Sequence, residues 1–273
     1  MRARRLPGVA ALLTAGAVAL SGCGTLASHR STASLGTDSP AAAHTSAGAR
    51  SGPAAARVVA PGKTLKLGAK GKAVQWLQQR LAQLGYRPGK ADGRYGGATM
   101  AAVWAFQKVN GIRPTSTVAK RTWDALETPR SPKVLVKDGR PTRAEVNLTK
   151  QIMVLYVDNE VKLITHVSSG SGVPYCETAT WQGKQQRFCG SASTPTGDYK
   201  TTWRARGWHR SYLGQLYNPI FFNGGIAFHG ALSVPLYPAS HGCVRMPMNV
   251  AEVLPGMLGK GVPVHVRGRF KRL

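Results

Sequence analysis

The chain has 273 residues and a formal net charge of +26, from 37 lysines and arginines against 11 aspartates and glutamates. This length allows one large domain or two modest ones, each with its own core. This excess of positive charge favours contact with polyanions, although a basic surface that is simply solvated is the simpler interpretation. The basic residues are scattered and no helix-turn-helix, zinc-finger or RNP pattern accompanies them, so we expect no nucleic-acid partner.

Residues 1–22 have the pattern of an export signal. Three arginines among the first five residues precede the apolar stretch Val9–Leu20, which is shorter than the roughly 20 apolar residues of a membrane-spanning helix. Ser21 and Gly22 then lead to Cys23. This run resembles the lipobox of bacterial lipoproteins, which implies a lipidated Cys23 anchored to the outer face of the cell membrane. The alternative is an ordinary secretory signal with an incidental cysteine, and either one directs the protein out of the cytoplasm.

Residues 23–62 differ from residues 63–128 in composition and in the spacing of apolar residues. The first segment is rich in Ala, Ser, Thr and Gly and lacks apolar periodicity, which is typical of a flexible tether. In the second segment, apolar residues recur at helical spacing from Val74 to Leu84 and Gly85 follows as a stop signal. The sequence therefore predicts a tether followed by a helical module.

Two more short helices complete this module. The second runs from Thr99, its expected N-cap, to a stop at Gly111, and the third begins at Thr122. A turn at Asp92-Gly93 separates the first two helices. Three short helices joined by glycine turns predict a compact all-α bundle.

The helical segment resembles the peptidoglycan-binding domain family of three-helix modules. The resemblance implies peptidoglycan as a binding partner, whereas a helical spacer that binds nothing is the alternative. One departure is the loop 113–120, where the family usually has an Asp-Gly turn. The matching positions are Gly68, Gly71, Val74, Leu77, Gln78, Leu81, Leu84, Gly85, Tyr86, Asp92, Gly93, Tyr95, Gly96, Thr99, Ala102, Val103, Phe106, Gln107, Gly111 and Thr122.

Residues 133–268, which follow a proline-containing linker, have a sequence pattern typical of β-strands. Short runs rich in β-branched residues predict strands at 144–148, 151–157, 160–170, 194–203, 224–230 and 261–268. Asp158-Asn159 fits a hairpin turn between two of them. A short helix is expected over 249–254, capped by Asn249 and stopped by Pro255. The fold class is therefore multidomain, a small three-helix bundle followed by a mainly β domain.

The stretch FHGALSVPLYPASHGCVRM contains a histidine and a cysteine that can form a catalytic pair. His229 is near the end of an apolar strand, and Cys243 follows a glycine turn. The segment between them is long enough for the chain to reverse and bring the two side chains together. A thiolate is a strong nucleophile for acyl transfer once a base accepts its proton. The amides of Gly242 and Cys243 are candidates for an oxyanion hole.

Zinc is the alternative for this stretch, since His229, His241 and Cys243 are ligands that zinc accepts. No carboxylate lies anywhere in residues 217–248 to orient such ligands. We therefore expect no metal and no cofactor.

The C-terminal half resembles the L,D-transpeptidase catalytic domain family. The resemblance implies Cys243 as nucleophile and His229 as base, with Ser240 and His241 orienting the site. Arg245 stands where some members have Asn and others Arg. The matching motifs, in order, are VNLTKQIMVLYVDNEV, TPTGDY, IAFHG, SHGCVRM and GVPVHV.

For several residues near the candidate catalytic pair, the sequence allows two interpretations. Arg245 is expected to pair with a substrate carboxylate, or else to lie in solvent. Tyr212 and Tyr217 are expected to cover the cleft and bind substrate, or else to be ordinary core or surface aromatics. His241 has a purely structural hydrogen-bonded role as its alternative.

The four cysteines divide by role. Cys23 is the lipidation candidate and Cys243 the nucleophile candidate, which leaves Cys176 and Cys189 flanking a Gln- and Gly-containing loop. An exported chain can keep a disulfide, so we predict that these two pair.

The resemblances together predict a monomeric peptidoglycan L,D-transpeptidase of the cell wall. Cys243 would form a thioester with a stem tetrapeptide donor, and an acceptor amine on a neighbouring stem would resolve it into a cross-link. Resolution by water would instead give an L,D-carboxypeptidase. A non-catalytic peptidoglycan-binding lipoprotein is the alternative from another class.

Overall fold

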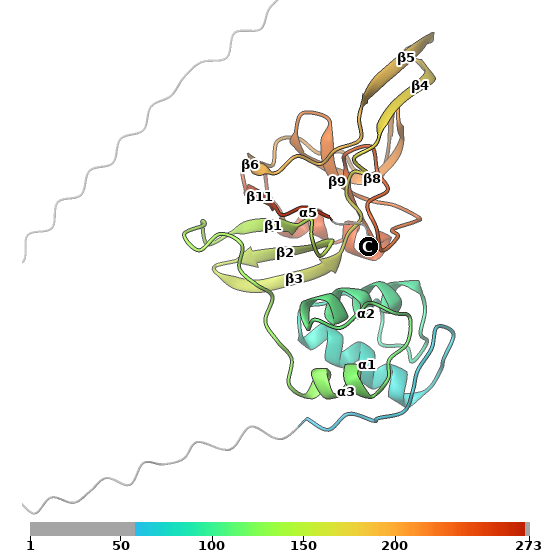
Figure 1. The fold of residues 1–273 in the computed structure, drawn as a ribbon, viewed down its shortest axis with the longest axis vertical. Coiled ribbons are helices and arrows are strands. Elements are labelled where there is room, and N and C mark those ends of the chain that lie inside the picture. Colours follow the sequence, from blue (N-terminus) through green and yellow to red (C-terminus); the bar gives the residue numbers. More distant parts are fainter. Residues whose placement is uncertain (1–57, 271–273) are drawn as a thin grey trace, which may run out of the picture. The chain divides into compact units, whose positions relative to one another are not determined.

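The computed structural model describes residues 58–270 (Figure 1). The expected export signal 1–22, the lipidation candidate Cys23 and most of the tether 23–62 lie outside these residues. Within them, no helix is long and apolar enough to cross a membrane. The described chain begins with three helices and continues into a mainly β region, as the sequence predicts.

The helical module consists of α1 (Lys72–Gln83), α2 (Gly97–Val109) and α3 (Lys120–Glu127). The first helix ends as predicted, because Gly85 has φ +84°. Its amide donates to Ala82 O at 3.1 Å, and the amide of Tyr86 donates to Leu81 O at 3.0 Å. These two bonds satisfy carbonyls that the helix end leaves without partners.

The N-cap predicted at Thr99 and the helix start predicted at Thr122 are wrong. Each threonine lies inside its helix, and neither helix has a side-chain cap. Both hydroxyls instead accept hydrogen bonds from buried glutamine side chains, Thr99 from Gln78 at 3.1 Å and Thr122 from Gln107 at 3.2 Å. A buried amide left without a partner is costly, so each threonine serves the contact between two helices.

The β region forms two main sheets and a separate hairpin. The first sheet has the order β3-β2-β1-β11-β6, the second β10-β9-β8-β7, and β4 pairs with β5 alone. The strands of the first sheet are β1 (Arg143–Asn147), β2 (Ile152–Val157), β3 (Glu160–His166), β6 (Gly197–Lys200) and β11 (Pro263–Arg267). The others are β7 (Trp208–Ser211), β8 (Gly214–Asn223), β9 (Ile226–Gly230), β10 (Val244–Met246), β4 (Pro174–Trp181) and β5 (Lys184–Ser191).

Side-chain alternation along β2 divides the apolar residues of the first sheet between two cores. Met153 and Leu155 pack with residues of the second sheet such as Phe228 and Val244. Ile152 and Val154 point to the other face, where they pack with the helices. Successive side chains of a strand point to opposite faces, so this sheet is the middle layer between helices and the second sheet.

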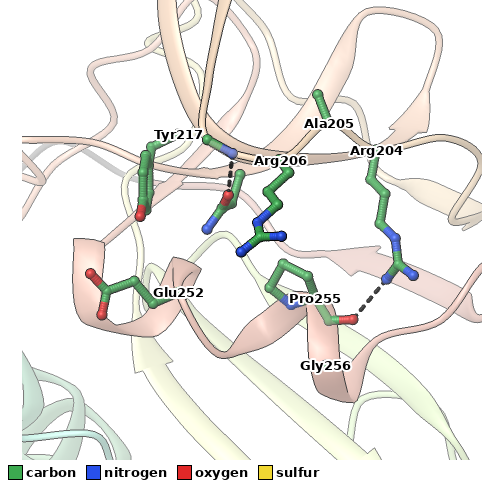
Figure 2. Close-up of a pocket in the computed structure, with 9 residues that line it drawn as sticks. Arg204, Ala205, Arg206, Tyr217, Glu252, Pro255 and Gly256 are labelled. Carbon is green, nitrogen blue, oxygen red and sulfur yellow. Dashed lines mark hydrogen bonds between the residues drawn. The ribbon is translucent and has the colours of Figure 1, made fainter.

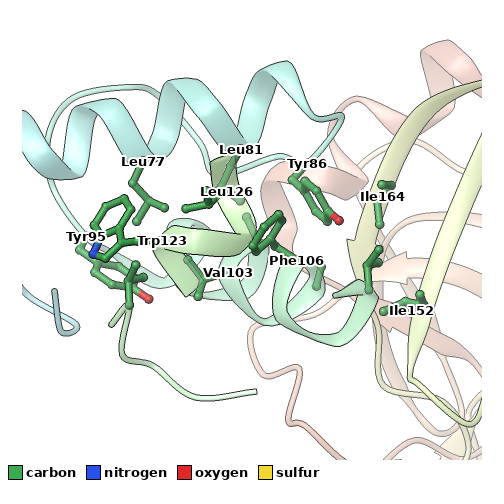
Figure 3. Close-up of a cluster of buried hydrophobic side chains, with 14 of the residues drawn as sticks. Leu77, Leu81, Tyr86, Tyr95, Val103, Phe106, Trp123, Leu126, Ile152 and Ile164 are labelled. Atoms are coloured by element: carbon green, nitrogen blue, oxygen red, sulfur yellow. The ribbon is translucent and has the colours of Figure 1, made fainter. Parts of the chain in front are cut away.

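The helical module and the β region therefore share one core (Figure 3). Tyr86 and Phe106 pack edge to face with ring centroids 5.6 Å apart, and Ile152 and Ile164 join them from the first sheet. The amide of Ile164 also donates to Gly85 O at 2.9 Å. The near-continuous apolar run of β2 was the sequence signal for this, because a strand buried on both faces loses its alternation.

The predicted helix over 249–254 is wrong in its limits and its caps. The structure has two short helices there, α4 (Met248–Ala251) and α5 (Leu254–Met257). Asn249 lies inside α4 and its side chain donates to Arg87 O at 2.9 Å. Pro255 lies in the first turn of α5, where its missing N–H costs nothing.

Candidate active site

Cys243 lies directly before β10, which pairs in parallel with β9. In this register Arg245 is opposite His229, and Val244 is opposite Phe228. Val244 and Phe228 are fully buried in the core. By alternation, Cys243 and Arg245 project from the other face of β10, the face from which His229 projects. The strand pairing thus brings together residues that the sequence separates.

Gly242 makes the turn that presents the thiol. It has φ +137°, a conformation that favours glycine, and a Cβ at this position would lie 2.9 Å from Ser193 O. The hydroxyl of Thr194 donates to Gly242 O at 2.6 Å. The backbone before Cys243 is therefore closely enclosed, and a residue larger than glycine does not fit.

Ser240 holds the backbone of this turn. Its hydroxyl donates to Cys243 O at 2.5 Å and accepts the Gly242 amide at 3.0 Å. The Gly242 amide is thus already engaged, and the expected oxyanion hole of two amides needs correction. The amide of Cys243 remains as the candidate donor.

His229 is buried, with 5% of its surface exposed. Burial, together with the nearby charge of Arg245, lowers its pKa to about 4, although the hydrogen bond to Gly230 O acts in the opposite direction. Its Nδ1 lies 2.9 Å from Gly230 O. A carbonyl can only accept, so Nδ1 carries the proton and Nε2 of the neutral ring is free to accept one.

The Cys243 thiol is protonated in the resting site. Burial raises its pKa, while the amide of Ala227 and the charge of Arg245 oppose this shift. Its Sγ lies 3.6 Å from Gly225 O, which accepts the thiol hydrogen. The cleft therefore holds a neutral thiol and a neutral imidazole, and a base would have to remove the thiol proton to give a thiolate.

These residues line a cleft of about 700 Å³. Cys243, His229, Ser240 and Arg245 all contribute to it. Aromatic side chains also line it, namely Tyr175, Trp181, Trp203, Trp208, Tyr212 and Phe221. Apolar and aromatic surface beside a few polar groups is typical of a ligand-binding cleft.

Residues 70–126 match the peptidoglycan binding domain family, and residues 141–266 match the L,D-transpeptidase catalytic domain family. A solved L,D-transpeptidase from Xylanimonas cellulosilytica is 38% identical, with 75% of this chain and 98% of that chain covered and a TM-score of 0.66. The chain belongs to the L,D-transpeptidase family. An L,D-transpeptidase from Stackebrandtia nassauensis is 26% identical over 76% of this chain and 96% of that one, with a TM-score of 0.41.

The matched domains give this L,D-transpeptidase its setting. One belongs to a family described as peptidoglycan-binding and the other is the catalytic domain of a peptidoglycan-acting family, which implies an activity in the extracytoplasmic cell wall. The fold class predicted from the sequence is confirmed by the helical region followed by the mainly β domain.

Tyr212 and Tyr217 line two different pockets in the structure of the L,D-transpeptidase. Tyr212 lines the cleft. Tyr217 instead lines a separate pocket of about 650 Å³ that includes Arg206 and Glu252 (Figure 2), so its expected place in the cleft is wrong. The β8–β9 register shifts beyond Tyr217, where Asn218 has φ +46°, and this irregularity breaks the simple alternation of the strand.

His241 makes the contacts of its structural alternative. Its Nε2 lies 2.7 Å from the Glu177 carboxylate, and its ring packs 4.7 Å from that of Tyr175. Both partners lie on β4, so His241 ties the nucleophile loop to the β4–β5 hairpin. Glu177 was not anticipated, because its segment was expected to be a loop.

The hairpin closes one side of the cleft. Cys176 and Cys189 lie directly opposite each other in its register, and a disulfide joins them with Cα atoms 4.0 Å apart. Phe188 stacks on Tyr212 at 4.2 Å. The bridge is thus adjacent in sequence to the carboxylate that holds His241.

A serine-rich segment after β3 supports the nucleophile loop. The amide and carbonyl of Ser168 bond Arg245, at 3.0 and 2.9 Å. Ser169 O accepts the amides of Ala239 and Ser240, at 2.9 and 3.0 Å. The Ser-Ser-Gly-Ser-Gly run was a signal for close backbone contact that sequence reasoning missed. Among residues 58–270, no cluster of three or more His, Cys, Asp or Glu side chains could hold a metal ion.

Proposed function

We propose that this protein cross-links peptidoglycan stems through a thioester on Cys243. The observation that carries the proposal is the shared face of β9 and β10, from which Cys243, His229 and Arg245 all line the same cleft. The tautomer of His229 supports it, because the lone pair of Nε2 is available as a base.

In the first half of the reaction, Nε2 of His229 accepts the thiol proton as Sγ attacks the carbonyl between the L-centre and the terminal D-Ala of a tetrapeptide stem. The Gly230 carbonyl stabilises the resulting imidazolium through Nδ1–H. The amide of Cys243 is the proposed donor to the tetrahedral oxyanion; one such donor contributes about 2.7–4 kcal/mol in other acyl-transfer enzymes. The C–N bond then breaks, and the departing D-Ala amine takes the proton from the imidazolium.

In the second half, an acceptor amine of a neighbouring stem attacks the thioester. His229 takes a proton from this amine, the C–S bond breaks, and the proton returns to Sγ. The product is an amide cross-link and a free thiol, so atoms and charges balance. If water replaces the amine, the same thioester yields a tripeptide, and the outcome is L,D-carboxypeptidase activity.

Arg245 is proposed to bind a carboxylate of the donor stem. It lies across from His229 and lines the cleft, and its charge lowers the pKa of both His229 and Cys243. A bound carboxylate would offset that charge, which raises the basicity of His229 when substrate is present. Donor binding would thus prepare the base for proton transfer.

The remaining roles complete the proposal. The helical module is proposed to hold peptidoglycan glycan, Cys23 to carry a lipid anchor, and the protein to act as a monomer. Tyr212 is proposed to contact the donor stem, since it lines the cleft. Ser240 and His241 are proposed to act through the position of the loop.

The test is incubation of the purified protein with a disaccharide-tetrapeptide, followed by mass analysis. Cross-linked dimer with release of D-Ala is the expected product, and Cys243→Ala should make none. Tripeptide alone would assign the carboxypeptidase alternative. Retained wall binding with neither product would favour the non-catalytic alternative.

A further inference from the structure

Lys108 lies near the end of α2 and is buried, with 9% of its surface exposed. Its Nζ lies 3.1 Å from Gln151 O and 2.8 Å from His166 Nδ1, and both acceptors belong to the catalytic domain. Burial lowers the pKa of this amine to about 7. A lysine is a costly residue to bury, and a methionine would fill similar space without the penalty. The contacts of Lys108 therefore call for an explanation beyond packing.

The first contact leads to the nucleophile loop. Gln151 is fully buried and adopts φ +50°, a rare conformation for this residue. Its side chain accepts the amide of Ser169 at 2.8 Å and donates to the Ser169 hydroxyl at 2.9 Å. Ser169 O in turn holds the amides of Ala239 and Ser240. Two residues thus connect Lys108 to the serine that holds the backbone of Gly242 and Cys243.

The second contact leads to the rim of the cleft. His166 Nε2 lies 3.0 Å from Val234 O, so this nitrogen carries the proton of the neutral ring. Nδ1 is then an acceptor and receives a hydrogen from Lys108. Val234 follows Leu232 and Ser233, which line the cleft between His229 and Ser240. Lys108 thereby stabilises the tautomer of His166 that binds the rim loop.

We propose that Lys108 is a positioning residue for the L,D-transpeptidase reaction, through which the helical module orders the segment 231–243 around Cys243. The inference rests on the proposed function for its catalytic readout. It makes the helical module part of the catalytic apparatus, in addition to any contact with the wall. The module would then be needed for activity even on a soluble stem fragment that it does not bind.

The test compares Lys108→Met with Val154→Ala in the full chain. Lys108→Met keeps an apolar side chain of similar length and removes the donor. Val154→Ala weakens the shared core from a position whose side chain belongs to no part of the hydrogen-bond network. Lys108→Met leaves two buried acceptors without their donor, and Val154→Ala leaves a cavity in the shared core, so both variants should lower the Tm. This controls for loosened docking of the module.

For Lys108→Met we expect a fall in kcat for cross-linking of at least tenfold, with KM changed less than threefold. Hydrogen exchange at the amides of Ala239 and Ser240 should accelerate at least tenfold. Val154→Ala should keep kcat and both exchange rates within about twofold of the wild type. Unchanged kcat and exchange in Lys108→Met would overturn the inference, as would equal losses in both variants.

The two proposals can fail separately. If the wild-type protein makes no thioester and no product, the proposed function fails. Hydrogen exchange and the rate of Cys243 alkylation by iodoacetamide still test the positioning role. We expect Lys108→Met to change that alkylation rate at least threefold while Val154→Ala leaves it unchanged, and equal rates in all three proteins would contradict the role.

Discussion

His229 and Arg245 lie directly opposite each other on the paired strands β9 and β10, on the face that carries Cys243. This one register places the Arg245 cation on the same face as His229 and Cys243, the proposed base and nucleophile. It lowers the pKa of His229, where burial acts in the same direction, and opposes the rise that burial imposes on the pKa of Cys243. Arg245 thus affects both proton-transfer partners as well as the charge offered to substrate.

Replacement of Arg245 tests this relationship. Arg245→Ala should lower kcat/KM for the tetrapeptide donor by about 10- to 100-fold, because a hydrogen bond to a charged group contributes about 1.5–3 kcal/mol. Arg245→Lys should recover part of the loss, since it keeps the charge but not the paired geometry. Steady-state kinetics on both variants provide the measurement, and equal activity in Arg245→Ala and the wild type would leave Arg245 as a solvated residue.

The pH profile follows from the shifts on His229 and Cys243. With a His229 pKa of about 4, kcat/KM should rise as pH increases through about 4 and then reach a plateau. It should fall only above the ordinary thiol range, where the raised pKa of Cys243 is passed and the proton for the leaving amine is lost. An acidic limb near pH 6.5 would contradict the buried neutral histidine.

The lowered pKa of His229 should also make the folding stability of the protein depend on pH. The pKa of His229 falls from 6.5 to about 4 on folding, so between these values the unfolded chain binds more protons. Folding stability should therefore decrease as pH falls from about 6.5 to about 4, by on the order of 3 kcal/mol for this group. Urea unfolding of wild type and His229→Gln across this range measures the difference, and identical pH dependence would contradict the assignment.

Tyr212 and Tyr217 form a matched pair for substrate contact. Tyr212→Ala should raise KM for the donor several-fold, because Tyr212 lines the cleft and stacks on Phe188. Tyr217→Phe should leave KM unchanged, because Tyr217 lines the separate pocket. A larger effect on KM from Tyr217→Phe would reverse the assignment of the two residues.

The disulfide should matter for binding more than for chemistry. The double replacement Cys176→Ser with Cys189→Ser frees the hairpin that carries Glu177, so we expect KM to rise a few-fold with little change in kcat. Closing a loop of this size contributes about 3 kcal/mol to the stability of the closed segment in the chain-entropy account. Peptide mapping without reductant should recover the two cysteines linked, and recovery of both as free thiols would rule out the bridge.

The sequence predicted the strand ends that carry the catalytic pair, because IAFHG is a short apolar strand and Gly242 marks a tight turn. It did not predict the β4–β5 hairpin, whose residues are mostly exposed and show no apolar alternation. Tyr217 was misplaced because its nearness to Tyr212 in the sequence does not tell which pocket its side chain lines. Long-range contacts such as that between His241 and Glu177 leave no local pattern at all.

Lys108 shows a different limit. Its place on a buried helix face conflicts with its charge, and such a conflict is a signal in itself. Its acceptors, Gln151 O and His166, become visible only when the helical module is packed on the first sheet. The sequence patterns of the helical module and of the β domain, each interpreted alone, thus gave no indication of the Lys108 contact that joins the two.

The most direct test of the account is the mass of the protein itself during turnover. The protein is incubated with the disaccharide-tetrapeptide, which serves as both donor and acceptor, quenched in acid within seconds, and measured intact and after digestion. The account predicts an added mass equal to the disaccharide-tripeptide acyl group, located on the peptide that contains Cys243 and absent from Cys243→Ala. Cross-linked product formed by a protein that carries no acyl group at Cys243 would contradict it.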